Sequence, residues 1–163
     1  MRTPLVVVAL FLLASCGTRF HYTPPAARVL TRTVVYELDY DAVWLRANRW
    51  FAAHSVDVQI DAADKASGWI AASNLAEVSP DVLDIGKITA TGPIAKGPII
   101  EQLLVVDVLI RGLGDQTEAT INVAGYFDAK AWSSLGLMSF TIRRAGRSTG
   151  ALEQSFHSSL AGQ

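Results

Sequence analysis

The chain has 163 residues, of which 50% are apolar and 18% are charged, and its formal net charge is −1. This composition predicts one globular domain, with or without a tail, and excludes a disordered or collagen-like chain. The near-neutral charge excludes the basic surface expected of a nucleic-acid-binding protein. A single cysteine excludes an internal disulfide and a cysteine-based zinc cluster. We therefore expect no bound metal and no cofactor.

The N-terminal residues have the pattern of a bacterial lipoprotein signal. Arg2 precedes an unbroken apolar run from Leu5 to Ala14. This run is too short to span a bilayer as a helix, which takes about twenty residues, but it suits the apolar region of a secretory signal. The run ends in Leu13-Ala14-Ser15-Cys16, which resembles a lipobox. We expect residues 1–15 to be a signal peptide and Cys16 to carry the lipid.

The residue after the cysteine predicts the destination. Gly17 stands where inner-membrane lipoproteins of enterobacterial type have aspartate. The expected location is therefore the bacterial cell envelope, on the periplasmic face of the outer membrane, with the N-terminal lipid as the membrane contact. The alternative is an ordinary secretory signal with a chance cysteine near its end.

The chain after the cysteine divides into a tether and one domain. Residues 16–31 lack periodicity and contain Pro24-Pro25, so we expect a tether that is stiffened at the prolines. Residues 32–163 are expected to form a single periplasmic domain. The first half of this domain predicts strands at 33–38, 56–60 and 68–73, with a polar turn at 61–67. Between the first two strands, apolar residues at helical spacing predict an amphipathic helix over 42–54.

The second half of the domain is rich in strand signals. Strands are expected at 81–87, 103–111, 117–126 and 138–143, and the second and third of these form a hairpin through a turn at 112–116. Residues 127–136 are ambiguous. A closing helix begins at a cap, Ser148 or Thr149, and presents Leu152, Phe156 and Leu160 on one face.

This order of elements, βαββ…βα, predicts an α+β fold. We expect an antiparallel sheet of about five to seven strands with two helices packed on one face. The other face of the sheet is left open to water or to a partner.

Three stretches together resemble bacterial envelope lipoproteins with BamC-like, helix-grip domains. They are the strand-helix-strand opening, the turn Asp64-Lys65-Ala66-Ser67-Gly68-Trp69-Ile70, and the segment Arg147-Ser148-Thr149-Gly150 that opens the last helix. The resemblance spans roughly residues 32–161. It implies a non-enzymatic role in complexes that assemble the outer membrane.

No motif of an enzyme active site stands out. The three histidines are scattered, and no nucleophile elbow appears. Asp107 is the one acid in an unexpected position, because it interrupts an apolar strand; it is either a polar contact to the returning strand or a catalytic acid. Asp57, Asp61 and Asp64 have the wrong spacing for a calcium loop and indicate a solvated turn.

Aromatic and branched residues supply the candidate contact surface. Trp44, Trp50 and Trp69 are expected in the core, with a sugar-binding platform as the alternative. An exposed apolar patch for a protein partner is predicted at Ile94, Ile99, Ile100 and Trp132. The alternative is that these segments fold down over the core.

The sequence thus predicts an outer-membrane-anchored lipoprotein that is not an enzyme. It would act as a scaffold or accessory subunit of an envelope complex, with a protein partner and without nucleic acid or metal. The alternative is a periplasmic module that binds a small apolar ligand, a glycan or a lipid.

Overall fold

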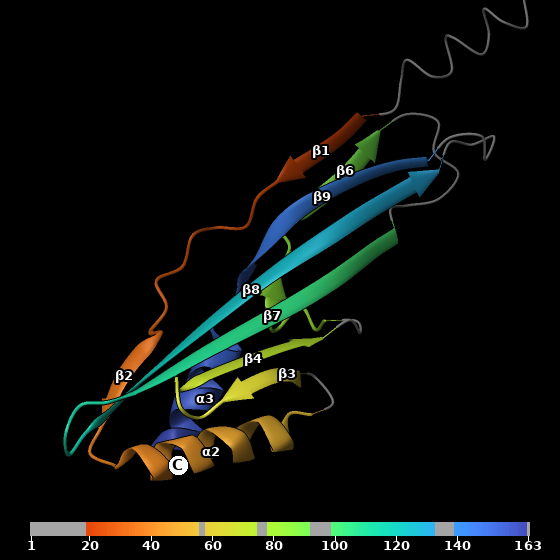
Figure 1. The fold of residues 1–163 in the computed structure, drawn as a ribbon. Coiled ribbons are helices and arrows are strands. Elements are labelled where there is room, and N and C mark those ends of the chain that lie inside the picture. Colours follow the sequence, from red (N-terminus) through yellow and green to blue (C-terminus); the bar gives the residue numbers. More distant parts are fainter. Residues whose placement is uncertain (1–18, 56–57, 75–77, 92–98, 133–138, 163) are drawn as a thin grey trace, which may run out of the picture.

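Figure 1 shows a computed structural model of the chain, which describes residues 19–55, 58–74, 78–91, 99–132 and 139–162. The expected α+β fold is confirmed. The described residues form a curled antiparallel sheet of seven strands, a second sheet of two strands, and two helices. Cys16 and Ile94 lie outside the described residues.

The main sheet is built from strands of very different length. They are β2 (Thr33–Tyr36), β3 (Gln59–Asp64), β4 (Trp69–Asn74), β5 (Leu83–Asp84), β7 (Ile99–Gly112), β8 (Thr117–Trp132) and β9 (Ser139–Ser148). Their order is β3-β4-β7-β8-β9-β5. Strand β2 pairs with Thr117–Thr120 at the start of β8, and β9 pairs with the later residues Ala124–Trp132 of the same strand. The second sheet pairs β1 (Arg19–Thr23) with β6 (Lys87–Thr91).

The β7–β8 hairpin is the spine of the fold. It pairs Ile99 with Lys130 at one end and Gly112 with Thr117 at the other. The segment that was ambiguous in sequence continues β8 as far as Trp132. We call the end of the sheet where β7 begins and β8 stops the tip, and the end at the β7–β8 turn the far end.

Both helices pack on the same face of the main sheet, which we call the inner face (Figure 1). Helix α2 (Tyr40–Ala53) begins after Asp39, whose carboxylate accepts a hydrogen bond from the Ala42 N–H at 2.7 Å. Helix α3 (Ala151–Ala161) begins after Gly150, so the expected Ser148 or Thr149 cap is wrong by one or two residues. Ser148 instead accepts a hydrogen bond from the Gly150 N–H, which holds the turn into the helix.

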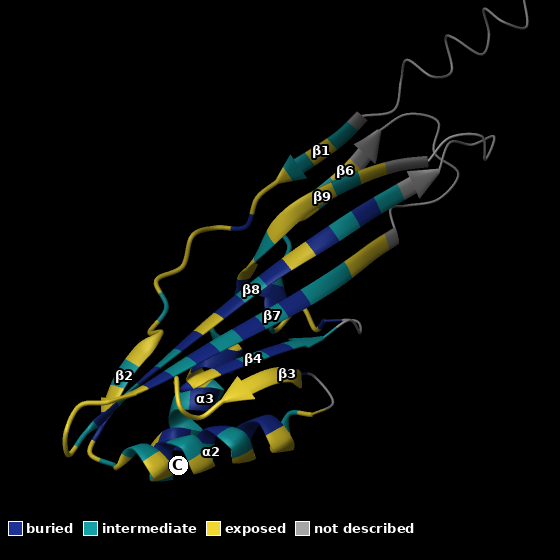
Figure 2. Ribbon diagram, viewed as in Figure 1, coloured by how far each residue is buried: buried dark blue, intermediate teal, exposed yellow. Residues whose placement is uncertain are grey.

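The core lies between the helices and the inner face. Trp50 of α2 is 2% exposed and meets Phe156 of α3 edge-to-face, with ring centroids 5.3 Å apart. The Trp50 indole N–H bonds to the Ser155 hydroxyl at 3.0 Å, so its one polar atom is satisfied. The alternate residues of β7 that face the helices are buried: Leu104, Val106, Val108 and Ile110. Figure 2 shows this alternation as dark blue bands along β7 and β8.

Two stretches are more ordered than the sequence suggested. The expected tether contains β1, in which Tyr22 packs against Phe127 of β8 at 5.7 Å and its hydroxyl donates to the Ala145 carbonyl. Alternating aromatic residues stabilise this strand because Phe20 and Tyr22 can pack on its pleated surface. The expected turn at 61–67 is also shorter, since β3 continues through an irregularity at Ile60 and Ala62 to Asp64.

Candidate partner-binding face

The face of the main sheet turned away from the helices is covered by none of the described elements. We call it the outer face. Strand geometry places alternate residues on opposite sides, and residues directly opposed across antiparallel strands lie on the same side. The outer face therefore carries the residues of β7 that lie between the buried ones, together with their partners on β4 and β8. Its large apolar side chains are Val35, Trp69, Leu103, Val105, Leu109 and Tyr126.

These side chains form rows across the sheet. Trp69 of β4 pairs with Leu109 of β7, and Leu103 of β7 pairs with Tyr126 of β8. Trp69 is 41% exposed and Tyr126 is 48% exposed, whereas Leu103 is half-buried. Large aromatic side chains that stay in water on a sheet face are typical of protein contact surfaces.

The expectation that all three helix and turn tryptophans belong to the core is wrong for Trp69. Trp50 is in the core and Trp44 is half-buried at its rim, stacked on Tyr40. Trp69 begins β4 one residue before Ile70, which is fully buried on the inner face. Because the side-chain period of a strand is two, burying Ile70 forces Trp69 onto the outer face.

Asp107 lies near the middle of this apolar face. Its register partners are Asn122 on β8 and Ala71 on β4, so no cation stands directly across either strand from it. None of the described histidines shares the outer face with Asp107, since His54 and His157 lie on helices of the inner face and His21 lies on β1. No described histidine therefore lies beside Asp107 on the outer face.

Towards the tip, the outer face is bordered by two ion pairs. Lys130 pairs with Glu101 at 2.5 Å, and Arg143 pairs with Asp128 through two hydrogen bonds of 2.8 and 2.7 Å. The Arg143 guanidinium holds the pKa of the Asp128 carboxyl below its usual value. A hollow of about 510 Å³ lies between these pairs and the Leu103–Tyr126 row. The face thus has an apolar middle and a charged, hollowed border.

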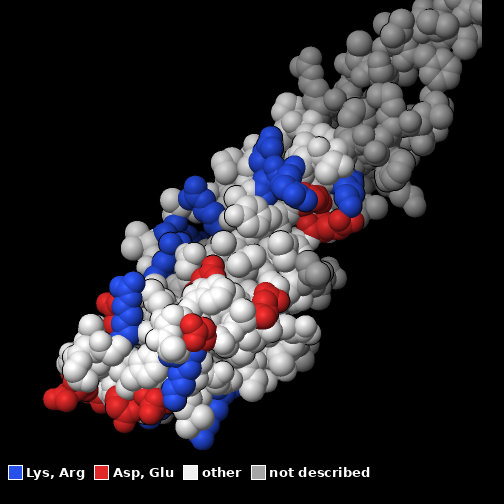
Figure 3. Space-filling model, viewed as in Figure 1, with Lys and Arg blue, Asp and Glu red and all other residues white. Residues whose placement is uncertain are grey.

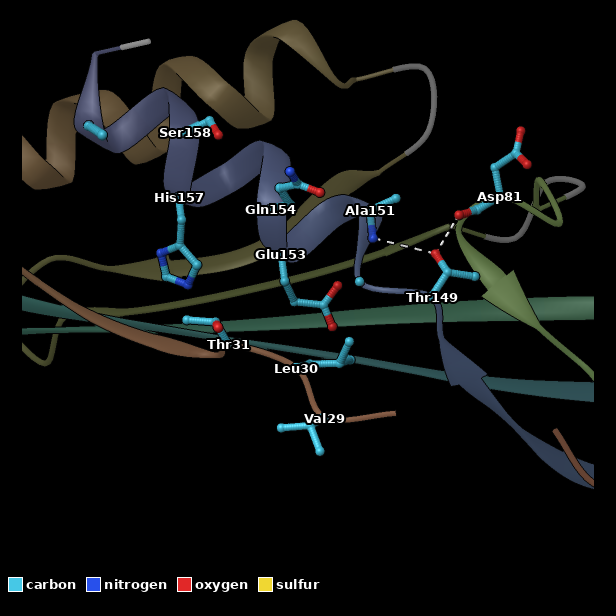
Figure 4. Close-up of a pocket in the computed structure, with 12 residues that line it drawn as sticks. Val29, Leu30, Thr31, Asp81, Thr149, Ala151, Glu153, Gln154, His157 and Ser158 are labelled. Atoms are coloured by element: carbon cyan, nitrogen blue, oxygen red, sulfur yellow. Dashed lines mark hydrogen bonds between the residues drawn. The ribbon is translucent and has the colours of Figure 1, made fainter. Parts of the chain in front are cut away.

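A second candidate site is a groove of about 760 Å³ beside α3 (Figure 4). It lies between that helix and the extended segment Val29–Thr31, toward which Glu153 and His157 both point. Glu153 is 2% exposed. One of its carboxylate oxygens, Oε2, accepts a hydrogen bond from the Ser148 hydroxyl at 2.8 Å, while Oε1 has no partner.

His157 lies in the groove wall, where burial and two hydrogen bonds define its surroundings. Burial lowers the pKa of His157 from 6.5, although the Arg32 carbonyl and Glu153 oppose the shift. Burial also raises the pKa of Tyr36 to about 12, so its hydroxyl keeps its proton. The Tyr36 hydroxyl lies 2.6 Å from His157 Nδ1, and His157 Nε2 lies 3.1 Å from the Arg32 carbonyl. The hydroxyl therefore donates to Nδ1, and a proton on Nε2 is donated to the carbonyl.

The residues expected to form the contact patch are described only in part. Ile100 is 36% exposed, near the start of β7. Ile99 and Trp132 occupy the ends of β7 and β8 at the tip, and Ile94 lies outside the described residues. The structure therefore leaves this patch untested.

The second face of the sheet was expected from the sequence to be open to water or to a partner, but none of the residues on it was named. The available signal was the run Leu103–Ile110, in which the odd-numbered and the even-numbered residues are both apolar, except for Asp107. Such a run indicates a strand with two apolar faces, and only one of them is covered by helices.

The described residues give no sign of a metal centre or a membrane span. No group of three or more His, Cys, Asp or Glu among them is placed to hold a metal ion. In the same part of the chain, no helix combines the length and the hydropathy needed to cross a membrane. No protein-family model, curated protein or solved structure was found to match the chain.

Proposed function

We propose that the protein is a lipoprotein of the bacterial outer membrane, anchored at Cys16, whose domain binds a partner protein as a non-catalytic scaffold or accessory subunit. The observation that supports this proposal is the outer face, on which Trp69, Leu109, Leu103 and Tyr126 lie without a covering element among the described residues. Apolar sheet faces of this kind are normally covered, because water contact forfeits about 25 cal/mol per Å² of apolar area.

The chemistry of the face favours a protein over a small molecule. Aromatic and branched side chains are spread over four strands, and aromatic residues are enriched in the cores of protein interfaces. Asp107 adds one carboxylate within the apolar surface. A partner that covers this face must present a cation or a hydrogen-bond donor to Asp107, since an unpaired buried charge is strongly unfavourable.

The test is recovery of a partner from native membranes in mild detergent. Trp69→Glu and Tyr126→Glu place a charge on the outer face and are expected to lose a stoichiometric partner that the unaltered protein retains. Leu45→Glu is the matched control, because Leu45 is 50% exposed on α2, on the other side of the molecule. Urea unfolding should give similar midpoints for all three variants. If both outer-face variants retain the partner, the outer face is not the binding surface.

Asp107→Asn sharpens this test. It keeps the shape of the side chain and removes the charge, so we expect the same fold and a binding constant weakened by about tenfold, the effect of losing about 1.4 kcal/mol. Binding that is unchanged would show that no cation of the partner meets Asp107.

Binding of a small ligand in the groove beside α3 is the second candidate. It is supported by the size of the groove and by the polar side chains in its wall, among them Glu153 and His157, which suit a polar ligand such as a glycan. Native mass spectrometry of the purified protein tests it. A bound small molecule that Glu153→Gln loses would favour this function over a protein partner.

A further inference from the structure

The position of β1 relates the proposed lipid anchor to the shape of the domain. Arg19, the first residue of β1, pairs with Thr91, the last residue of β6. Tyr22 contacts Phe127 and the Ala145 carbonyl. Further along the chain, the Arg28 side chain donates a hydrogen bond to the Thr149 carbonyl. Since Phe127 lies between Thr149 and the tip, the start of β1 is at the tip (Figure 1).

The anchor is therefore close to the tip. Cys16 precedes Arg19 by three residues, which span at most about 10 Å even when fully extended. If Cys16 carries the lipid, the bilayer surface lies within this distance of the start of β1. The strand pairing of β1 with β6 fixes which end of the domain that is.

Charged side chains are also distributed differently between the tip and the far end of the sheet. Lys130, Arg143 and Arg144 lie near the tip together with Glu101 and Asp128; Lys130 and Arg143 form ion pairs with these two acids, and Arg144 is the cation that neither pair includes. Carboxylates outnumber cations around the far end, at the β7–β8 turn and the start of α2: Glu37, Asp39, Asp41, Asp64, Asp115 and Glu118, with Lys65 and Arg111 among them. Figure 3 shows acidic side chains gathered at the far end, whereas basic side chains are spread along the length of the molecule, some of them near the tip.

An apolar residue also lies near the tip, since Ile100 on β7 is 36% exposed. A surface that joins cations to exposed apolar residues suits an anionic phospholipid interface, where each nearby Lys or Arg contributes about 1 kcal/mol.

We propose that the tip is seated on the anionic phospholipid surface that holds the lipid anchor, so that the main sheet stands away from the bilayer. This inference rests on the proposed anchoring at Cys16. The fourteen residues of β7 span about 45 Å, so the far end is held well clear of the membrane. The outer face then runs from the membrane outward and remains open to a partner along its whole length.

The test measures energy transfer from the domain to the bilayer. The full-length lipidated protein is reconstituted into vesicles of equal parts phosphatidylcholine and phosphatidylglycerol that carry a headgroup-linked acceptor. A donor dye is attached at Thr141→Cys near the tip or at Leu113→Cys at the far end; both positions are exposed, and the lipid occupies the thiol of the one natural cysteine. We expect transfer to be several-fold greater from position 141 than from position 113.

The outcomes separate the two proposals. A protein that does not float with the vesicles would overturn the anchoring and the orientation together. A protein that floats but shows equal transfer from both dyes would overturn the orientation alone. Unequal transfer in native membranes that becomes equal in pure lipid vesicles would mean that a membrane protein, and not the lipid surface, receives the tip.

A charge reversal tests the lipid contact independently. Arg144→Glu should reduce transfer from position 141 in vesicles that contain phosphatidylglycerol and have no effect in vesicles of phosphatidylcholine alone. Arg49→Glu makes the same change of charge on exposed α2, away from the tip, and should have no effect in either. Circular dichroism checks that β1 survives the loss of the Arg144 contact with the Tyr22 ring. Equal behaviour of the two variants would count against the lipid contact.

Discussion

Val105 and Val106 are neighbours on β7, yet they face different surroundings. Val106 is fully buried under the helices, whereas Val105 lies half-buried on the outer face between Ser73 and Ala124. The same contrast separates Trp50 from Trp69. The inner face stabilises the fold because it removes apolar surface from water, while the outer face leaves comparable side chains available for contact. The two faces therefore differ in whether the helices cover them, and not in the type of residue that they carry.

The largest difference is expected between the two tryptophans. Trp50→Ala should lower the free energy of unfolding by about 3–5 kcal/mol, because it opens a cavity between α2 and α3. Trp69→Ala should cost about 1 kcal/mol, since its ring is already 41% exposed. Urea denaturation of the two variants measures both values. Equal costs would mean that the outer face is a second core, and the proposed binding surface would be wrong.

Two glycines at the far end separate the cost of packing from the cost of backbone conformation. Gly68 and Gly114 have nearly the same left-handed φ, +74° and +77°. A Cβ at Gly68 would lie 2.0 Å from the Ile110 carbonyl oxygen, whereas one at Gly114 would meet nothing within 4 Å. Gly114→Ala should therefore cost about 1–2 kcal/mol for the backbone alone.

Gly68→Ala should cost about 1–3 kcal/mol more, because β4 must move away from β7. The difference between the two unfolding free energies is the quantity to measure. Equal values would show that the β4–β7 pairing yields easily and is not held by close packing.

A smaller effect on stability is expected from the hydrogen-bonded pair of Tyr36 and His157 on the inner face. Tyr36→Phe removes the hydrogen bond to His157 Nδ1 and leaves that nitrogen without its donor. The expected cost is about 1–2 kcal/mol, measured by urea unfolding at neutral pH. A neutral outcome would mean that water replaces the hydroxyl.

His157 also predicts a dependence of stability on pH. Its folded-state pKa is lowered from 6.5 by burial, so the unfolded chain binds the proton more tightly. The stabilisation is complete above pH 6.5 and is lost as the pH falls through the folded-state pKa. His157→Gln should flatten this part of the curve, and His21→Gln, which changes an exposed residue of β1, is the control. An unchanged slope in His157→Gln would assign the dependence to other groups.

Local sequence signals were sufficient for the elements whose partners lie nearby or whose periodicity is clear. Helix α2 follows from the spacing of Val43, Ala47 and Trp50, and the β7–β8 hairpin follows from two apolar runs joined by a glycine turn. Signals were weaker for β1, because its partner β6 lies far along the chain and its stability depends on Tyr22 packing against Phe127.

The sequence by itself therefore determined the α+β class, the two helices and the apolar character of β7, since these depend on periodicity and side-chain size. Only the tertiary structure decided which of the two apolar faces the helices cover. It turned Trp69 outward by burying Ile70, and it placed Asp107 between Ala71 and Asn122 on the outer face. It also joined β1 to the tip through β6. Each of these features depends on contacts between residues distant in the chain, which no local pattern encodes.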